Sequence, residues 1–164
     1  MFTRREPKPD PMGVVMQPSG PPLPASEFFS NRLTCIKNLK AIGSGFAAWS
    51  SRHHYEYPFN VSTNAGGTKE LCAAGPEQFD SNAVFHFQVM TNPEELTTPA
   101  LLVCPQDKLK KPAPSFSELT ASNVTYRLRT GVNITGSHPK EVLIVCPVDG
   151  NILYCDGTVV EGKK

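Results

Sequence analysis

A stripe of apolar residues at helical spacing is the feature that most constrains the fold of this chain. The stripe consists of Phe29, Leu33, Ile36, Leu39, Ile42, Phe46 and Trp49. Its members are three or four positions apart, which is the spacing of side chains on one face of an α-helix. The mean step is below that of an ideal helix, so the stripe drifts around the helix axis. We therefore predict one long helix whose stripe is covered by the local sheet or by a partner.

The sequence also marks where this helix begins and ends. Pro24 prevents the helix from extending backwards, and Ser26 can cap its first turn. Glu27 follows as an acidic residue, which suits the positive end of a helix dipole. Pro58 sets the limit by which the helix must have ended.

Residues 1–25 differ in composition from the rest of the chain. Seven of the sixteen prolines lie between Pro7 and Pro24. Proline fixes φ and lacks an N–H, so we predict an extended, flexible, proline-rich tail. Such a tail is either a ligand for a proline-binding domain or a segment without a specific partner. Residues 26–164 then form the globular domain.

The second half of the chain is typical of short strands joined by tight turns. We predict strands at Ala100–Cys104, Val124–Leu128, Val142–Cys146, Asn151–Cys155 and Thr158–Val160. Asp-Gly pairs at 149–150 and 156–157 are hairpin signals. Residues 76–90 fit a short helix or a strand, and we favour the helix; residues 93–96 are typical of a single helical turn. The predicted fold is α+β, with a long N-terminal helix packed on a small antiparallel sheet.

Charge and motif content exclude several classes of function. Lys and Arg total 16 against 15 for Asp and Glu, which argues against a nucleic-acid partner because that requires a clustered positive surface. No uninterrupted apolar run is long enough to cross a bilayer, so we predict no membrane span in this chain. The sequence contains no glycine-rich phosphate loop, HExxH or nucleotide-binding motif. We therefore predict a non-enzymatic protein without a cofactor.

Two of the five cysteines begin matching C-P-x-D segments, at Cys104 and Cys146. Zinc knuckles are also tight turns that begin with Cys-Pro, but a structural zinc site usually takes four Cys or His ligands, and Asp is a harder oxygen donor. In an exported protein a disulfide between Cys104 and Cys146 is the favoured interpretation; otherwise both are small core residues. A zinc or calcium module organised by these two segments remains an alternative function.

The carboxylates of the last hairpin are candidate calcium ligands. Asp149 and Asp156, together with Glu161 and backbone carbonyls, could gather around Ca²⁺. The simpler interpretation is ordinary Asp-Gly turn chemistry, in which the aspartate hydrogen-bonds its own backbone. We favour the turn, because calcium usually takes more oxygen ligands than these segments offer.

Several blocks of the sequence resemble a known family. Residues 35–43 (CIKNLKAIG), followed by Phe46, Trp49 and Tyr57-Pro58, resemble the C-x-N-N-L-K-Q-I-G…YP signature of bacterial pilin-like proteins. These are the pseudopilins of type II secretion and related prepilin-type proteins. Later blocks of the same group are similar to residues 62–68 (STNAGGT), 86–92 (HFQVMTN), 102–105 (LVCP), 150–153 (GNIL) and 156–159 (DGTV). The match runs from about residue 31 to the end of the chain.

The resemblance implies the same helix-on-sheet fold and a structural role in protein transport. Helices of such subunits bundle into a periplasmic pseudopilus, so the implied partners are other protein subunits of a secretion or pilus-like assembly. The implied location is the periplasm or cell envelope. Some major pseudopilins hold calcium in a C-terminal loop, which favours a calcium site in the last hairpin.

The chain departs from the family in two places. Family members begin with a short basic leader and a long apolar segment that anchors and polymerises the subunit, whereas this sequence has the proline-rich segment there. We therefore expect an anchorless form of the domain, which would be cytoplasmic if this start is native. Family members also tend to carry His where this chain has Asp149.

Overall fold

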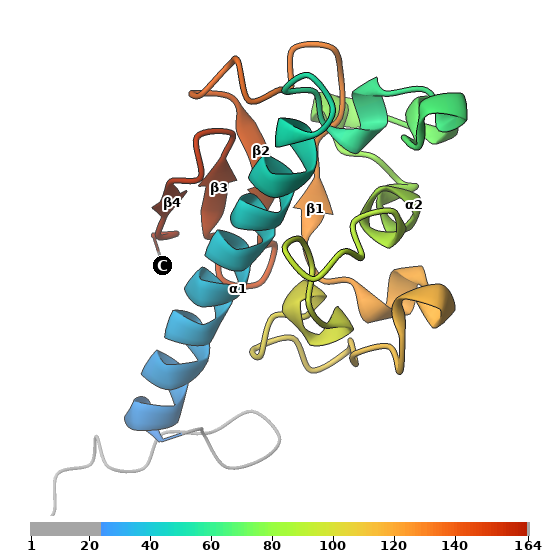
Figure 1. The fold of residues 1–164 in the computed structure, drawn as a ribbon. Coiled ribbons are helices and arrows are strands. Elements are labelled where there is room, and N and C mark those ends of the chain that lie inside the picture. Colours follow the sequence, from blue (N-terminus) through green and yellow to red (C-terminus); the bar gives the residue numbers. More distant parts are fainter. Residues whose placement is uncertain (1–23, 164) are drawn as a thin grey trace, which may run out of the picture.

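The computed structural model describes residues 24–163, in which one long helix is followed by short helices and a small sheet (Figure 1). The α-helices are α1 (Ala25–Ser51) and α2 (Ala83–Gln88). Short 3₁₀ helices are η2 (Pro58–Asn60), η3 (Thr63–Ala65), η4 (Lys69–Leu71), η5 (Pro76–Gln78), η6 (Pro99–Leu102), η7 (Phe116–Glu118) and η8 (Ala121–Asn123). The strands are β1 (Arg127–Leu128), β2 (Val142–Val145), β3 (Ile152–Tyr154) and β4 (Val159–Val160). The predicted α+β fold is confirmed.

The boundaries of α1 follow the proline signals more closely than the capping signal. Pro24 is the N-cap, and the helix begins directly after it, so the prediction that Ser26 caps the helix is wrong by two residues. The helix ends at Ser51, before the limit set by Pro58. The predicted tail, residues 1–25, lies outside the described residues except for Pro24 and Ala25.

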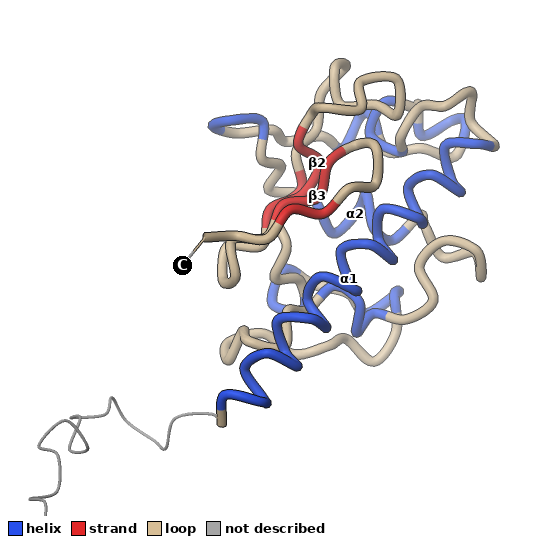
Figure 2. The backbone as a smooth tube through the Cα atoms, turned by 90° about the vertical axis from the view of Figure 1, so that its left-hand side faces the viewer, coloured by secondary structure: helices blue, strands red, loops and turns tan. Residues whose placement is uncertain are grey.

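The sheet is an antiparallel meander that lies beside α1 (Figure 2). Its strand order is β1-β2-β3-β4, and each strand pairs with the next along the chain. Ile144 of β2 faces Leu153 of β3, which in turn faces Val159 of β4. A register shift between Val142 and Ile144 marks an irregularity in β2. Helix α1 contacts β3, β4 and η6, so its buried face joins the sheet to the segment that precedes it.

The apolar stripe is buried along only part of α1. Leu39, Ile42 and Phe46 have no exposed surface, and they pack in one core with residues of the sheet. Of the two predicted ways of covering the stripe, the local sheet does not reach Phe29 and Leu33, which are 63% and 55% exposed. The reason is visible in Figure 1, where the first turns of α1 extend beyond the sheet.

Three smaller predictions are corrected by local geometry. Ala100–Cys104 is not a strand, because Pro99 and the Thr98 side chain, which accepts a hydrogen bond from Ala100 N, start the 3₁₀ helix η6 there. The strand expected at 124–128 is reduced to β1, since Val124 N donates to the carbonyl of Ala121 at the end of η8 and Thr125 N donates to the carbonyl of Leu102. Residues 93–96 form a turn without a helix, whereas the helix favoured within 76–90 is confirmed as α2. Within residues 24–163, no helix has the length and apolar character needed to cross a membrane.

The loop after α1 is fixed by the carboxylate of Glu70. Ser62 Oγ donates a hydrogen bond to Glu70 Oε1 at 2.6 Å, and Thr63 N donates one to Oε2 at 2.8 Å. These bonds lower the pKa of Glu70 from 4.5 to about 2, because they favour the charged form.

A pH-dependent effect of Glu70→Gln is expected. Because the pKa of Glu70 is lower in the folded state than in the unfolded chain, its charge stabilises the fold at pH values above the unfolded pKa of 4.5. This stabilisation is lost as the pH falls through the folded-state pKa of about 2. Glu70→Gln should therefore lower the melting temperature slightly near neutral pH, and the difference from the wild type should vanish near pH 2. Thermal melts followed by circular dichroism over this range measure it. If the difference in melting temperature between the two proteins did not change with pH, the charge of Glu70 would contribute nothing to stability.

Candidate metal centre

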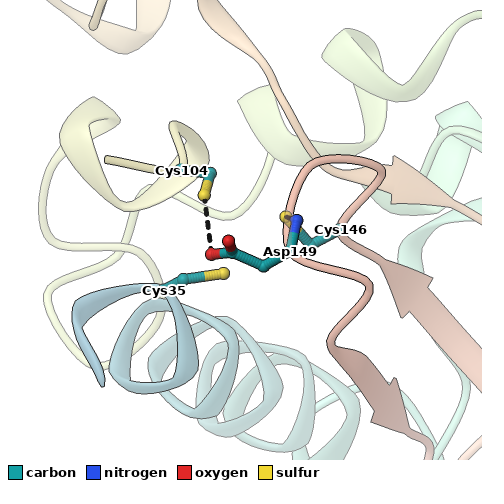
Figure 3. Close-up of side chains that lie close together, drawn as sticks. All are labelled: Cys35, Cys104, Cys146 and Asp149. Carbon is teal, nitrogen blue, oxygen red and sulfur yellow. Dashed lines mark hydrogen bonds between the residues drawn. The ribbon is translucent and has the colours of Figure 1, made fainter. Parts of the chain in front are cut away.

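Four side chains from separate parts of the chain converge in the interior (Figure 3). Cys35 comes from α1, Cys104 follows η6, Cys146 follows β2, and Asp149 lies in the turn that leads to β3. One ligand atom of each lies within 4.8 Å of the ligand atoms of the other three, and all four residues are buried. We call these four residues the three-cysteine centre.

The two C-P-x-D segments form similar turns on either side of this centre. Asp107 N donates a hydrogen bond to the carbonyl of Cys104 at 2.9 Å, and Gly150 N donates one to the carbonyl of Cys146 at 2.8 Å. Gly150 has a φ of 74°, in the left-handed region that favours glycine. The first turn spans three residues from its cysteine and the second spans four, and both place a buried thiol at the centre.

Cys35 completes the centre from the helix. It lies one turn before Leu39 and two turns before Ile42, so all three share the face of α1 that the sheet covers. The Cys35 side chain points toward Asp149 in Figure 3. The sequence analysis did not identify Cys35 as a ligand. Its only signal is a cysteine on the buried face of the helix, a position that a small core residue fills equally well.

Hydrogen-bond donors surround the sulfur atoms. Asp149 N donates to Cys146 Sγ at 3.3 Å, and Asn151 Nδ2 and Tyr126 OH donate to Cys35 Sγ at 3.4 and 3.6 Å. Donors directed at sulfur favour the thiolate, which is the form that binds metals. Hydrogen bonds from Cys104 and Cys35, together with that backbone N–H, lower the pKa of Cys146 to about 3. Hydrogen bonding to Cys146 and burial raise the pKa of Cys104. For Cys35, the hydrogen bond with Cys104 lowers the pKa, but hydrogen bonding to Cys146 and burial outweigh it and raise the pKa, so that only Cys146 favours the thiolate.

The carboxylate of Asp149 is buried in an unusual environment. Cys104 Sγ donates a hydrogen bond to Asp149 Oδ2 at 3.2 Å, while Oδ1 is buried and has no hydrogen-bond partner. Leaving a buried carboxylate oxygen unpaired is costly. A cation among the four ligand atoms would offset this cost.

In the structure, the two aspartates of the predicted calcium site lie in different environments. Asp149 belongs to the three-cysteine centre, so the interpretation of Asp149 as an ordinary turn aspartate is incomplete. Asp156 is exposed and accepts a hydrogen bond from Thr158 N at 2.8 Å, as turn chemistry predicts. Within residues 24–163, no cluster of three or more potential metal ligands includes Asp156 or Glu161. A calcium site in this hairpin that includes backbone carbonyls stays a prediction.

The five cysteines are all free thiols in the structure. Cys104 and Cys146 lie close together, as the disulfide prediction requires, but no disulfide joins them. Cys155 is buried outside the three-cysteine centre, and Cys72 is exposed. Cys155 therefore provides a buried cysteine for comparison with the ligands.

Comparisons with protein-family models, curated proteins and solved structures find no match for this chain. The resemblance to pilin-like proteins, with its implied assembly and its location in the periplasm or cell envelope, stays a prediction. The functional argument therefore rests on the geometry of the centre.

Proposed function

We propose that this chain is a non-enzymatic structural domain in which a single zinc ion, bound by the three-cysteine centre, fastens the long helix to the sheet. The observation that carries the proposal is the convergence of four buried ligand atoms, all within 4.8 Å of one another. They come from α1, from the segment after η6 and from the end of β2. A metal ion here links three segments that are far apart in the sequence.

The distances fit one metal ion. Zinc binds sulfur at about 2.3 Å and oxygen at about 2.0 Å, so two ligands of a tetrahedral site lie about 3.3–3.8 Å apart. Cys104 Sγ and Asp149 Oδ2 are 3.2 Å apart, and no ligand pair in the centre exceeds 4.8 Å. An iron–sulfur cluster would hold its cysteines further apart, because several irons and sulfides lie between them.

The ligand set favours zinc over calcium or magnesium. Thiolates are soft ligands, whereas calcium and magnesium bind through oxygen. Three thiolates and one carboxylate leave a zinc centre with net negative charge, and the donors from Tyr126, Asn151 and the Asp149 backbone stabilise that charge. The aspartate thus takes the fourth position of a zinc site.

A structural role is favoured over a catalytic one. Structural zinc sites are closed by four protein ligands, whereas catalytic sites keep one position for water or substrate. All four residues of the centre are buried, so a bound ion would have no position open to solvent. We propose that the ion stabilises the domain without activating a substrate.

The zinc proposal has a direct test in native mass spectrometry of protein purified without chelator. The wild type is expected to carry zinc that Cys146→Ser loses, since serine is a poorer ligand. Cys155→Ser is the matched control, because it alters a buried thiol outside the centre. Equal zinc content in wild type and Cys146→Ser would contradict the proposal.

A second candidate function is assembly with other protein subunits through the start of α1. It is favoured by the exposure of Phe29 and Leu33, two large apolar residues on the turns that extend beyond the sheet. We propose that helices of neighbouring subunits cover these residues in a pilus-like assembly, as the family resemblance implies. Joint substitution of both by Asp should prevent incorporation into assemblies isolated from the source cells while leaving the fold intact. Normal incorporation of a folded variant would contradict this role.

A further inference from the structure

A second group of potential metal ligands lies outside the three-cysteine centre. Cys72, Asp80 and His86 each place one ligand atom within 4.8 Å of the ligand atoms of the other two. His86 Nε2 is 3.3 Å from Asp80 Oδ2, and both side chains are completely buried. Cys72 is exposed, so the group reaches from the interior to the surface. We call these three residues the outer group.

The histidine of this group has a free ring nitrogen directed at the aspartate. Thr68 Oγ1 is 2.6 Å from His86 Nδ1, and this bond fixes the orientation of the ring. When Nδ1 donates to the threonine, Nε2 carries a lone pair, as in a metal-binding histidine. Nε2 is buried and has no hydrogen-bond partner in suitable geometry, although it lies close to the Asp80 carboxylate. A cation between the two would give His86 Nε2 a partner.

Asp80 is held in its charged form and in a fixed position. Its Oδ2 accepts hydrogen bonds from Thr130 Oγ1 at 2.7 Å and Ala73 N at 3.0 Å, and its Oδ1 accepts one from Asn82 N at 2.7 Å. Despite burial, these bonds leave the pKa of Asp80 below its usual value. Such outer contacts are typical of residues that orient a metal ligand.

We propose that Cys72, Asp80 and His86 form a second site for a zinc-type divalent ion, with one coordination position open to solvent. The separation of 3.3 Å between Nε2 and Oδ2 matches two ligands of one tetrahedral ion. One thiolate, one carboxylate and one neutral imidazole balance the charge of a divalent ion. Three protein ligands leave a fourth position, and the exposed cysteine places it at the surface.

A cysteine nucleophile is the other chemistry that these residue types suggest. Burial, and then the charge of Asp80, raise the pKa of Cys72. A reactive cysteine requires the opposite shift, because the thiolate is the nucleophile. A bound cation removes this obstacle, since it stabilises the thiolate directly. The raised pKa therefore argues against a cysteine nucleophile, and the metal site is supported by the proximity of the three ligand atoms.

Cobalt titration of the metal-free protein, followed by absorbance, separates the two sites. The wild type is expected to bind two Co²⁺ per chain, and Cys72→Ser and Cys146→Ser are each expected to bind one. The thiolate-to-cobalt absorption remaining in Cys72→Ser should be about three times that in Cys146→Ser, as the two sites differ in cysteine number. Equal cobalt binding by Cys72→Ser and the wild type would overturn the second site. Loss of most of the thiolate-to-cobalt absorption in Cys146→Ser would independently show that the three-cysteine centre binds cobalt.

Added imidazole tests the open position. It should shift the cobalt spectrum of Cys146→Ser, in which only the outer group binds, and leave that of Cys72→Ser unchanged, since the three-cysteine centre is closed. No shift in Cys146→Ser would overturn the open position. Both variants replace only the sulfur atom by oxygen, and circular dichroism establishes that each is folded before titration.

Discussion

Removal of the metal from the three-cysteine centre is expected to lower the free energy of unfolding by about 3 kcal/mol or more. The centre ties α1 to the end of β2 and to the segment after η6. Without the ion, three thiols and a carboxylate with an unpaired oxygen remain together in the interior. Structural zinc contributes its binding free energy to folding, because the unfolded chain has no preformed site.

Thermal unfolding with and without a chelator measures this effect. For a chain of this length, a loss of 3 kcal/mol corresponds to a fall of about 10 °C in melting temperature. The chelator should lower the melting temperature of the wild type and of Cys155→Ser by similar amounts. It should have a smaller effect on Cys146→Ser, which has lost the ion of the three-cysteine centre and keeps only that of the outer group. A similar response to the chelator in all three proteins would contradict a structural metal in the centre.

The substitution Leu39→Asp is expected to unfold the domain. Leu39 is completely buried at the centre of α1, where it belongs to the core shared with the sheet. An aspartate there either carries an unpaired charge or takes up a proton, and it also leaves unfilled volume. The expected loss exceeds about 4 kcal/mol, which is a large fraction of the stability of a typical domain. Phe46→Asp should act in the same way, because Phe46 is equally buried.

Phe29→Asp is the matched control on the same helix. Phe29 belongs to the same sequence stripe but is 63% exposed, so its substitution should change the free energy of unfolding by less than about 0.5 kcal/mol. Chemical denaturation followed by circular dichroism compares the variants. Cooperative unfolding of Leu39→Asp at the wild-type denaturant concentration would show that α1 does not pack as described.

The sequence predicts the architecture because its signals are local. The spacing of the apolar stripe identifies α1, and the Asp-Gly pairs mark the hairpins of the sheet. It does not predict that Phe29 and Leu33 stay exposed, since helical spacing does not reveal how far along α1 the sheet extends. The apolar run at 100–104 is ambiguous for a similar reason, because burial alone does not distinguish a strand from the 3₁₀ helix η6.

The sequence indicates only some of the residues of the candidate site. The two C-P-x-D segments identify Cys104, Cys146 and Asp149 as special, and the structure brings these residues together. Cys35 could not be assigned to them, because it lies more than sixty residues earlier and meets them only through the packing of α1. The same applies to the outer group, in which Cys72, Asp80 and His86 share no motif.

X-ray absorption spectroscopy of zinc-loaded Cys72→Ser tests whether the three-cysteine centre binds zinc. This variant removes a ligand of the outer group, so the spectrum reports the ion in the three-cysteine centre. We expect a zinc coordination shell of three sulfur atoms at about 2.3 Å and one oxygen at about 2.0 Å. A shell composed only of nitrogen and oxygen atoms would contradict it, because the bound ion would then not be held by Cys35, Cys104 and Cys146.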